Sequence, residues 1–174
     1  MMAKRLQTVR ILTAFLIFGL VISGITAFPL LHELNLLSGF FTNAEGRLDP
    51  DDYSGIAHWI LFVREGLEVT YGAYPFIGYG TDWLAFGHIV IALFFVPAYR
   101  DPIRYQDIYR VGIWAALLVF PLAFICGPIR GIPVYWRLID CMFGVVAMIP
   151  LFWILRLIRK MESEERQERE KPPI

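Results

Sequence analysis

Four long apolar segments constrain this chain more than any other feature, because each approaches the length that a helix needs to cross a bilayer. Such a helix requires about 20 mostly apolar residues. The segments are 11–31, 83–99, 111–129 and 133–155. The first and third carry no charged side chain, the second contains His88, and the fourth contains Arg137 and Asp140. The sequence therefore predicts an all-α integral membrane protein with four transmembrane helices.

Composition supports this fold class and limits the partners. Hydrophobic residues make up 57% of the 174 residues and charged residues 18%, whereas soluble domains average about 45–50% and about 25%. The formal net charge of zero lacks the basic excess of a nucleic-acid-binding protein, and no nucleotide-binding motif is present. We expect the lipid bilayer as partner, with a homo-oligomer or a larger membrane complex as further options. We expect one domain over 1–160 and a charged cytoplasmic tail over 161–174.

Basic residues near the span ends predict the orientation. With the N-terminus inside, twelve Lys and Arg residues lie on the inner side, against four on the outer side. We therefore expect a bacterial inner-membrane protein with both termini in the cytoplasm. The first apolar segment is longer than the 7–15 residues of a signal-peptide core, so we interpret it as a retained anchor. Cleavage after Ala27 is the alternative.

The connection between the first two spans is expected to lie outside and to contain an amphipathic helix over 53–71. One face of that helix carries the apolar residues Ile56, Trp59, Ile60, Val63 and Leu67, at helical spacing. The segment 43–52 is predicted to be a loop in which Asp51 or Asp52 caps the helix. The aromatic segment 72–81 is predicted to be rich in turns and to form an interfacial belt.

Polar side chains gather in the outer half of this predicted bundle. At 1.5 Å per residue, His88 lies roughly 8 Å and Asp140 roughly 10 Å below the outer ends of their spans. The other members are Arg137, Arg130 in the last hairpin, and His58, Glu65 and Glu68 on the external helix. Intramembrane ionisable groups indicate function by default. We predict that this cluster binds a ligand or stabilises the fold of a non-catalytic binding or accessory protein.

The two outer arginines permit two interpretations. The first is pairing, of Arg137 with Asp140 and of Arg130 with Glu65, Glu68 or Asp82, because intramembrane charges usually find partners. The second is a bound anion, such as a phosphate or a carboxylate, held by the planar guanidinium fork. Of the two, the sequence favours pairing.

The histidines support the main alternative, a redox protein that binds haem or a divalent metal. His88 would act as a ligand together with His58 or His32, since neutral imidazole binds both metal ions and haem iron. No spacing typical of a metal site is present. Further alternatives are a proton-linked transporter subunit that uses Asp140 and His88, and a lipid-directed enzyme with a glutamate base. Cys126 and Cys141 are expected to be free thiols.

Overall fold

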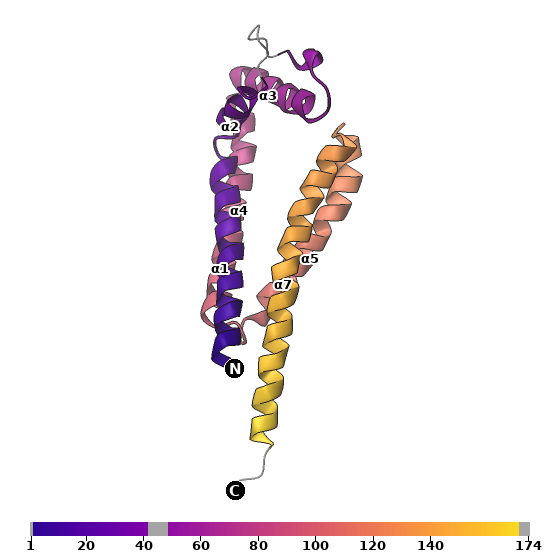
Figure 1. Cartoon of the computed structure of the whole chain (residues 1–174). Coiled ribbons are helices and arrows are strands. Elements are labelled where there is room, and N and C mark those ends of the chain that lie inside the picture. The colour runs from indigo at the N-terminus through magenta and orange to yellow at the C-terminus, as the bar shows by residue number, and fades with distance from the viewer. Residues whose placement is uncertain (1, 42–48, 171–174) are drawn as a thin grey trace. The chain divides into compact units, whose positions relative to one another are not determined.

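The computed structural model describes residues 2–41 and 49–170, and every regular element in these ranges is a helix. Four helical stretches are long and apolar enough to cross a membrane, which confirms the predicted number. They are Met2–Ala27, Pro75–Arg100, Gln106–Ile129 and Val134–Arg169. The elements in chain order are α1 (Met2–Ala27), α2 (Leu30–Ser38), η1 (Pro50–Asp52), α3 (Gly55–Ala73), η2 (Pro75–Ile77), α4 (Gly78–Arg100), α5 (Gln106–Pro121), η3 (Leu122–Cys126), α6 (Gly127–Ile129) and α7 (Val134–Arg169) (Figure 1).

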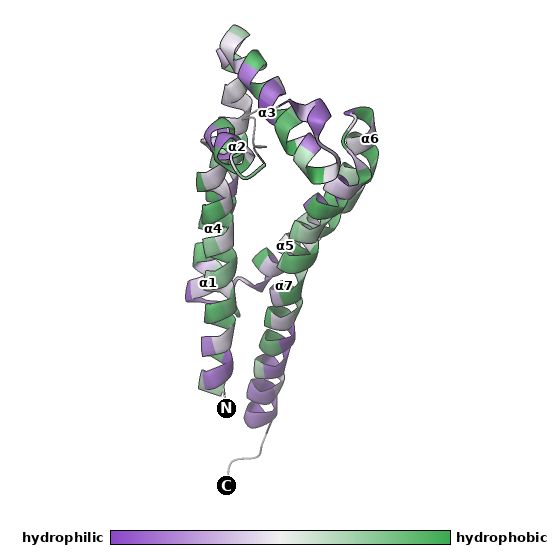
Figure 2. Cartoon of the chain, turned by 45° about the horizontal axis from the view of Figure 1, so that its top comes forward, coloured by the Kyte–Doolittle hydropathy of each residue, from purple (hydrophilic) through white to green (hydrophobic). Residues whose placement is uncertain are grey.

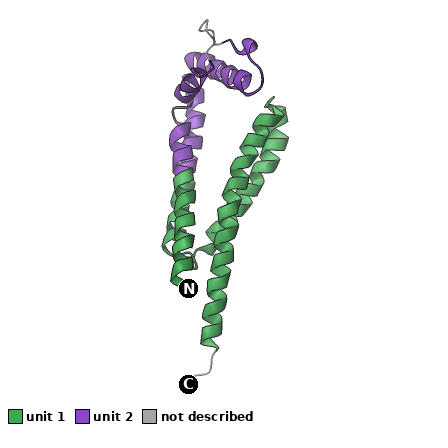
Figure 3. Ribbon diagram, viewed as in Figure 1, with its two compact units in different colours: residues 1–19, 91–174 green, residues 20–90 purple. Residues whose placement is uncertain are grey.

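The chain divides into two compact units, which are coloured separately in Figure 3. Unit 1 contains Met1–Gly19 and Ile91–Ile174, and unit 2 contains Leu20–Val90. The single domain that we expected over 1–160 stays a prediction. Each unit has its own packing, and the candidate residues of each are described within it.

Unit 1 is organised around the antiparallel pair α5 and α7. A Cβ atom at Gly112 would meet Leu151, and one at Gly144 would lie 2.7 Å from the carbonyl oxygen of Ala116. The residue numbers of the contacting positions rise along α5 and fall along α7, so the two helices run in opposite directions. Small residues allow this close approach of two backbones, as is common between membrane helices.

Hydrogen bonds fix the other helical parts of unit 1 to this pair. The buried hydroxyl groups of Thr13 and Tyr109 lie 2.8 Å apart and join α1 to α5. The Gln106 amide donates to Glu162 at 2.9 Å, and Arg5 forms an ion pair with Glu164. The last two contacts lie at the end of α7 that Figure 2 shows as hydrophilic.

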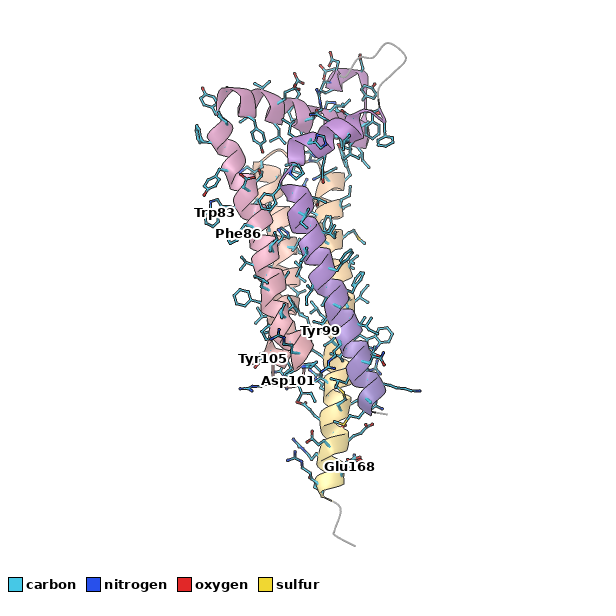
Figure 4. The ribbon with its side chains drawn as sticks, turned by 90° about the vertical axis from the view of Figure 1, so that its left-hand side faces the viewer. Trp83, Phe86, Tyr99, Asp101, Tyr105 and Glu168 are labelled. Atoms are coloured by element: carbon cyan, nitrogen blue, oxygen red, sulfur yellow. The ribbon has the colours of Figure 1, made fainter. Side chains whose placement is uncertain are left out.

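In unit 2, α2 and α3 pack together and α1 approaches α4. A Cβ atom at Gly24 would lie 2.8 Å from the carbonyl oxygen of Ala85, so glycine is required at that crossing. On α4, Trp83 contacts Tyr79 and Phe86 edge to face, with ring centroids 6.0 and 5.8 Å apart. Trp83 and Phe86 project outward from the helix in Figure 4.

The first apolar segment is shorter than we expected at its C-terminal end. Helix α1 ends at Ala27, and the residues up to 31 and beyond belong in part to the separate helix α2. Pro29 precedes α2 and has no amide hydrogen, so it cannot continue the hydrogen bonding of α1. His32 therefore lies on α2 rather than at the end of the first span.

The segment 72–81 is also more helical than predicted. Helix α3 continues to Ala73, only Tyr74 separates it from η2, and α4 begins at Gly78. Glycine and proline suggested turns, but Pro75 occupies the first position of a short 3-10 helix, where its missing amide hydrogen costs no hydrogen bond. The predicted turn-rich belt is thus mostly helix.

The start of α3 differs from the predicted cap. Asp51 and Asp52 lie in η1, where the Asp49 side chain accepts a hydrogen bond from the Asp51 amide at 3.0 Å. Helix α3 begins at Gly55, after Ser54. Residues 42–48, which include most of the predicted loop 43–52, lie outside the described residues. The position of α3 at a membrane surface stays a prediction.

Candidate functional site

The turn between α6 and α7 places Arg130 and Arg137 of unit 1. Gly131 has a φ of 69°, which a glycine adopts without strain. The Ile132 amide donates to the Gly127 carbonyl at 3.0 Å, and the Gly131 amide donates to the Pro128 carbonyl at 3.1 Å. This pair of bonds is the Schellman motif that ends a helix. It closes α6 beside Arg130, whose side chain is exposed.

Arg137, one turn into α7, packs back onto this turn. A Cβ atom at Gly127 would lie 2.3 Å from Cδ of Arg137 and 2.9 Å from its Cγ. The aliphatic part of the arginine therefore occupies space that only a glycine leaves free. Its Nε atom is buried and has no hydrogen-bond partner among the described residues. A buried donor without an acceptor costs about 1–3 kcal/mol, and more when it is charged.

The expected ion pair between Arg137 and Asp140 is absent from the part of the chain that the structure describes. The three residues Arg130, Arg137 and Asp140 lie on one α6–α7 hairpin, as the sequence indicated. The aliphatic part of Arg137, however, contacts Gly127 on the preceding helix. Arg137 and Asp140 thus form no ion pair in this structure, and the pairing of Arg130 with Glu65, Glu68 or Asp82 stays a prediction.

In unit 2, the described partner of Glu68 is Arg64 on the same helix. Arg64 donates to Glu68 at 3.0 Å and to the side-chain oxygen of Asn35 at 2.7 Å. The bond to Asn35 joins α2 to α3, whereas the ion pair with Glu68 lies within α3. Glu65, three residues before Glu68, is exposed. Arg64 and Asn35 were not among our candidates, because nothing in the sequence places the segment that became α2 beside α3.

The three histidines all belong to unit 2. The Nδ1 atom of His58 lies 2.8 Å from the Pro50 carbonyl, and that of His88 lies 2.8 Å from the Leu84 carbonyl. A carbonyl only accepts, so each Nδ1 carries the proton and each Nε2 is left as an acceptor. His32 is exposed on α2. Within the described ranges, no group of three or more His, Cys, Asp or Glu side chains is placed to hold a metal ion.

The two cysteines are both free, with Cys141 buried and Cys126 exposed. Cys126 is the last residue of η3, a π-helical turn that follows Pro121. A wide turn after a proline accommodates the lost hydrogen bond. Gly127, against which Arg137 packs, comes directly after this turn. Apart from the glycine itself, nothing in the sequence indicates this contact.

Comparison of the chain with protein-family models, with curated proteins and with solved structures finds no match in any of the three.

Proposed function

We propose that this chain is an integral membrane protein of the non-catalytic binding or accessory type. The support is apolar surface that the chain does not cover itself. In the most apolar stretch of each candidate span, only 17% to 33% of the residues are buried. Large side chains such as Phe18, Trp114 and Phe143 are 63% to 70% exposed. Soluble monomers rarely expose contiguous apolar surface on this scale, and lipid would cover it.

The orientation in this proposal places both termini in the cytoplasm. It rests on the positive-inside rule and on the twelve-to-four distribution of basic residues described above. The α6–α7 turn then faces outward, and the hydrophilic end of α7 faces the cytoplasm. Arg130 and Arg137 lie on the side that is otherwise poor in basic residues.

The ligand that we propose at the α6–α7 turn is an anionic group, a carboxylate or a phosphate. One observation carries this proposal, namely the buried Nε of Arg137 that has no acceptor among the described residues. An anion would supply the missing acceptor, and the exposed Arg130 lies near enough in sequence to add a second guanidinium. Arginine remains protonated and offers donors in a fixed fork. Such a donor set suits binding rather than proton transfer.

Membrane integration is tested by extracting membranes that contain the full chain with alkaline carbonate and separately with detergent. We expect the protein to resist carbonate and to dissolve in detergent. Reporter fusions at each terminus should be active only on the cytoplasmic side. Release by carbonate, or a terminus on the opposite side, would contradict this part of the proposal.

Anion binding is tested by thermal unfolding of the detergent-purified protein in phosphate or acetate, with chloride balancing the ionic strength. A ligand at about 100 times its Kd stabilises the folded state by about 2.7 kcal/mol. We expect stabilisation of the wild type and its loss in Arg137→Gln. Arg104→Gln, which removes an exposed arginine elsewhere in unit 1, is the matched control. Equal responses of all three proteins would refute the anion site.

Metal or haem binding is the second candidate function, favoured by the two histidines with Nδ1 at a backbone carbonyl. The same arrangement orients many histidines whose Nε2 binds a metal. Elemental analysis and visible absorption of the purified protein, compared with His88→Ala, test this candidate. Stoichiometric metal that disappears in the variant would establish it. Metal-free, folded wild-type protein would eliminate it.

A further inference from the structure

A groove of about 660 Å³ runs between α5 and α7, entirely within unit 1. It is separate from the α6–α7 turn, since no residue of that turn lines it. On α5 the groove is lined by Arg110, Trp114 and Leu117, and on α7 by Phe152, Arg156 and Arg159. In each set the spacing is i, i+4 and i+7, so each lines one face of its helix.

The groove is polar at one end and apolar at the other. Gly112 on α5 packs against Leu151 on α7, and Ala116 packs against Gly144. Arg110 and Phe152 therefore lie near the same level. Arg156 and Arg159 lie beyond them at one end of the groove, and Trp114 and Leu117 lie toward the other end. Seven residues of helix span about 10 Å. The groove therefore changes from cationic to aromatic and aliphatic over roughly that distance.

The arginines carry a surplus of positive charge. Arg110 donates to Asp107 at 2.7 Å and to the Gln106 side chain at 3.2 Å. Arg156 and Arg159 have neither an ion pair nor a side-chain hydrogen bond among the described residues, and no acidic side chain lines the groove. Cationic side chains without carboxylates at the edge of a bilayer attract anionic headgroups.

The helices beneath this groove are held in a fixed register. Tyr109, next to Arg110, is fully buried and is hydrogen-bonded to Thr13 and to the Ala98 carbonyl. The bond from Gln106 to Glu162 joins the same ends of α5 and α7. The spacing of the arginines across the groove is therefore set before any ligand arrives, which reduces the ordering cost of binding.

We propose that this groove binds an anionic phospholipid of the cytoplasmic leaflet. The headgroup phosphate is held by Arg110, Arg156 and Arg159, because guanidinium groups match phosphate in charge and fork geometry. One acyl chain lies along Trp114 and Phe152, which are 67% and 56% exposed. The charge at one end and the apolar surface at the other fit an amphiphile better than a free anion. This inference rests on the membrane location proposed above.

Native mass spectrometry of the full chain, released from detergent in the presence of two phospholipids with identical acyl chains, tests the proposal. The lipids are phosphatidylglycerol, which is anionic, and phosphatidylcholine, which is zwitterionic. The test variant is Arg156→Gln with Arg159→Gln, and the matched control is Arg166→Gln with Arg169→Gln. Both remove two charges from α7, but only the first pair lines the groove. Trp114→Ala tests the apolar end without changing charge.

We expect the wild type to retain phosphatidylglycerol in preference to phosphatidylcholine. Retention should fall about fivefold for each groove arginine removed, the factor that corresponds to the usual contribution of a basic residue near a membrane. The control variant should behave as the wild type, and Trp114→Ala should also weaken retention. Inorganic phosphate at millimolar concentration should not displace the lipid.

Three outcomes would overturn the proposal. Equal retention of both lipids, or equal loss in the control variant, would mean nonspecific attraction to headgroups. Displacement by inorganic phosphate would assign the arginines to a free anion. A dimer that Trp114→Ala dissociates, with no change in bound lipid, would assign the groove to a second copy of the chain.

Two controls keep the result interpretable. If circular dichroism shows that the double arginine variant is unfolded, Trp114→Ala and the phosphate competition by themselves test whether the groove binds an anionic phospholipid. If the protein resists carbonate but retains no anionic lipid, this inference fails while the proposed function stands. If carbonate releases the protein, the proposed function fails first.

Discussion

The Tyr109 hydroxyl donates a hydrogen bond to the Ala98 carbonyl at 3.0 Å. In a continuous helix that carbonyl would accept from the amide four residues later, but Pro102 occupies that position and has no amide hydrogen. A tyrosine on α5 thus replaces the lost backbone donor at the end of α4. The same hydroxyl lies 2.8 Å from Thr13 Oγ1, so one side chain joins three helices of unit 1.

Replacement of Tyr109 by Phe should lower the free energy of unfolding by about 1–3 kcal/mol, because the Ala98 carbonyl is left without its donor. Measured values for bonds between membrane helices average about 0.6 kcal/mol, which favours the lower part of this range. Unfolding in mixed micelles measures the change. Tyr105→Phe, at an exposed position on the neighbouring turn, should have little effect. Equal losses in the two variants would contradict the assigned role.

Substitution of Gly144 by Ala should separate α5 from α7. The new Cβ would lie 2.7 Å from the Ala116 carbonyl oxygen, and a backbone atom cannot move aside without shifting its helix. We expect a loss of about 1–3 kcal/mol, typical of overpacking. Gly87→Ala is the control, since a Cβ there meets nothing within 4 Å and alanine favours the helix. The same micelle unfolding assay compares the two, and an unchanged Gly144→Ala protein would refute the close approach.

Substitution of Gly127 by Ala should affect the proposed anion site more than the fold. Its Cβ would lie 2.3 Å from Arg137 Cδ, and the flexible side chain can move away at small cost to stability. The guanidinium would then leave its buried position. We expect the melting temperature without phosphate to change little, while the increase caused by phosphate is lost. Full retention of that increase would show that the position of Arg137 is irrelevant to binding.

The ion pair between Arg5 and Glu164 should contribute little and should depend on salt. Its two side chains are 22% and 40% exposed, and ion pairs in contact with solvent contribute about 0.2–1 kcal/mol. Glu164→Gln should destabilise the protein within that range at low salt and less at 0.5 M salt. Exchanging the two residues, Arg5→Glu with Glu164→Arg, should restore the stability of the wild type. A salt-independent effect would mean that packing, not charge, is responsible.

Local pattern was sufficient to predict most of the helices. The four apolar stretches could be predicted as helices because a helix satisfies its own backbone hydrogen bonds without any partner. Their approximate positions follow from the local composition alone. The errors lie at prolines and glycines. Pro29 ends the first helix early, whereas Pro75 allows a short helix where we predicted turns. Such residues interrupt or begin a helix according to their neighbours, which single-sequence patterns resolve poorly.

That Arg130, Arg137 and Asp140 share one hairpin could be predicted from the sequence, because the three residues are close together in it. The sequence could not predict their contacts. The preference of Arg137 for Gly127 over Asp140 depends on how closely α6 approaches α7, and that distance follows from the turn at Gly131. The bond between Arg64 and Asn35 likewise joins residues 29 positions apart.

By itself, then, the sequence determined the number of apolar helices, the distribution of basic residues along the chain, and the positions of the few polar residues within the apolar segments. These properties belong to single segments and arise from hydrophobicity, charge and backbone hydrogen bonding. Only the tertiary structure decided that α5 pairs with α7, that Tyr109 replaces the amide missing at Pro102, and that three arginines line one end of a groove. Such contacts join distant segments, and close packing of complementary shapes selects them.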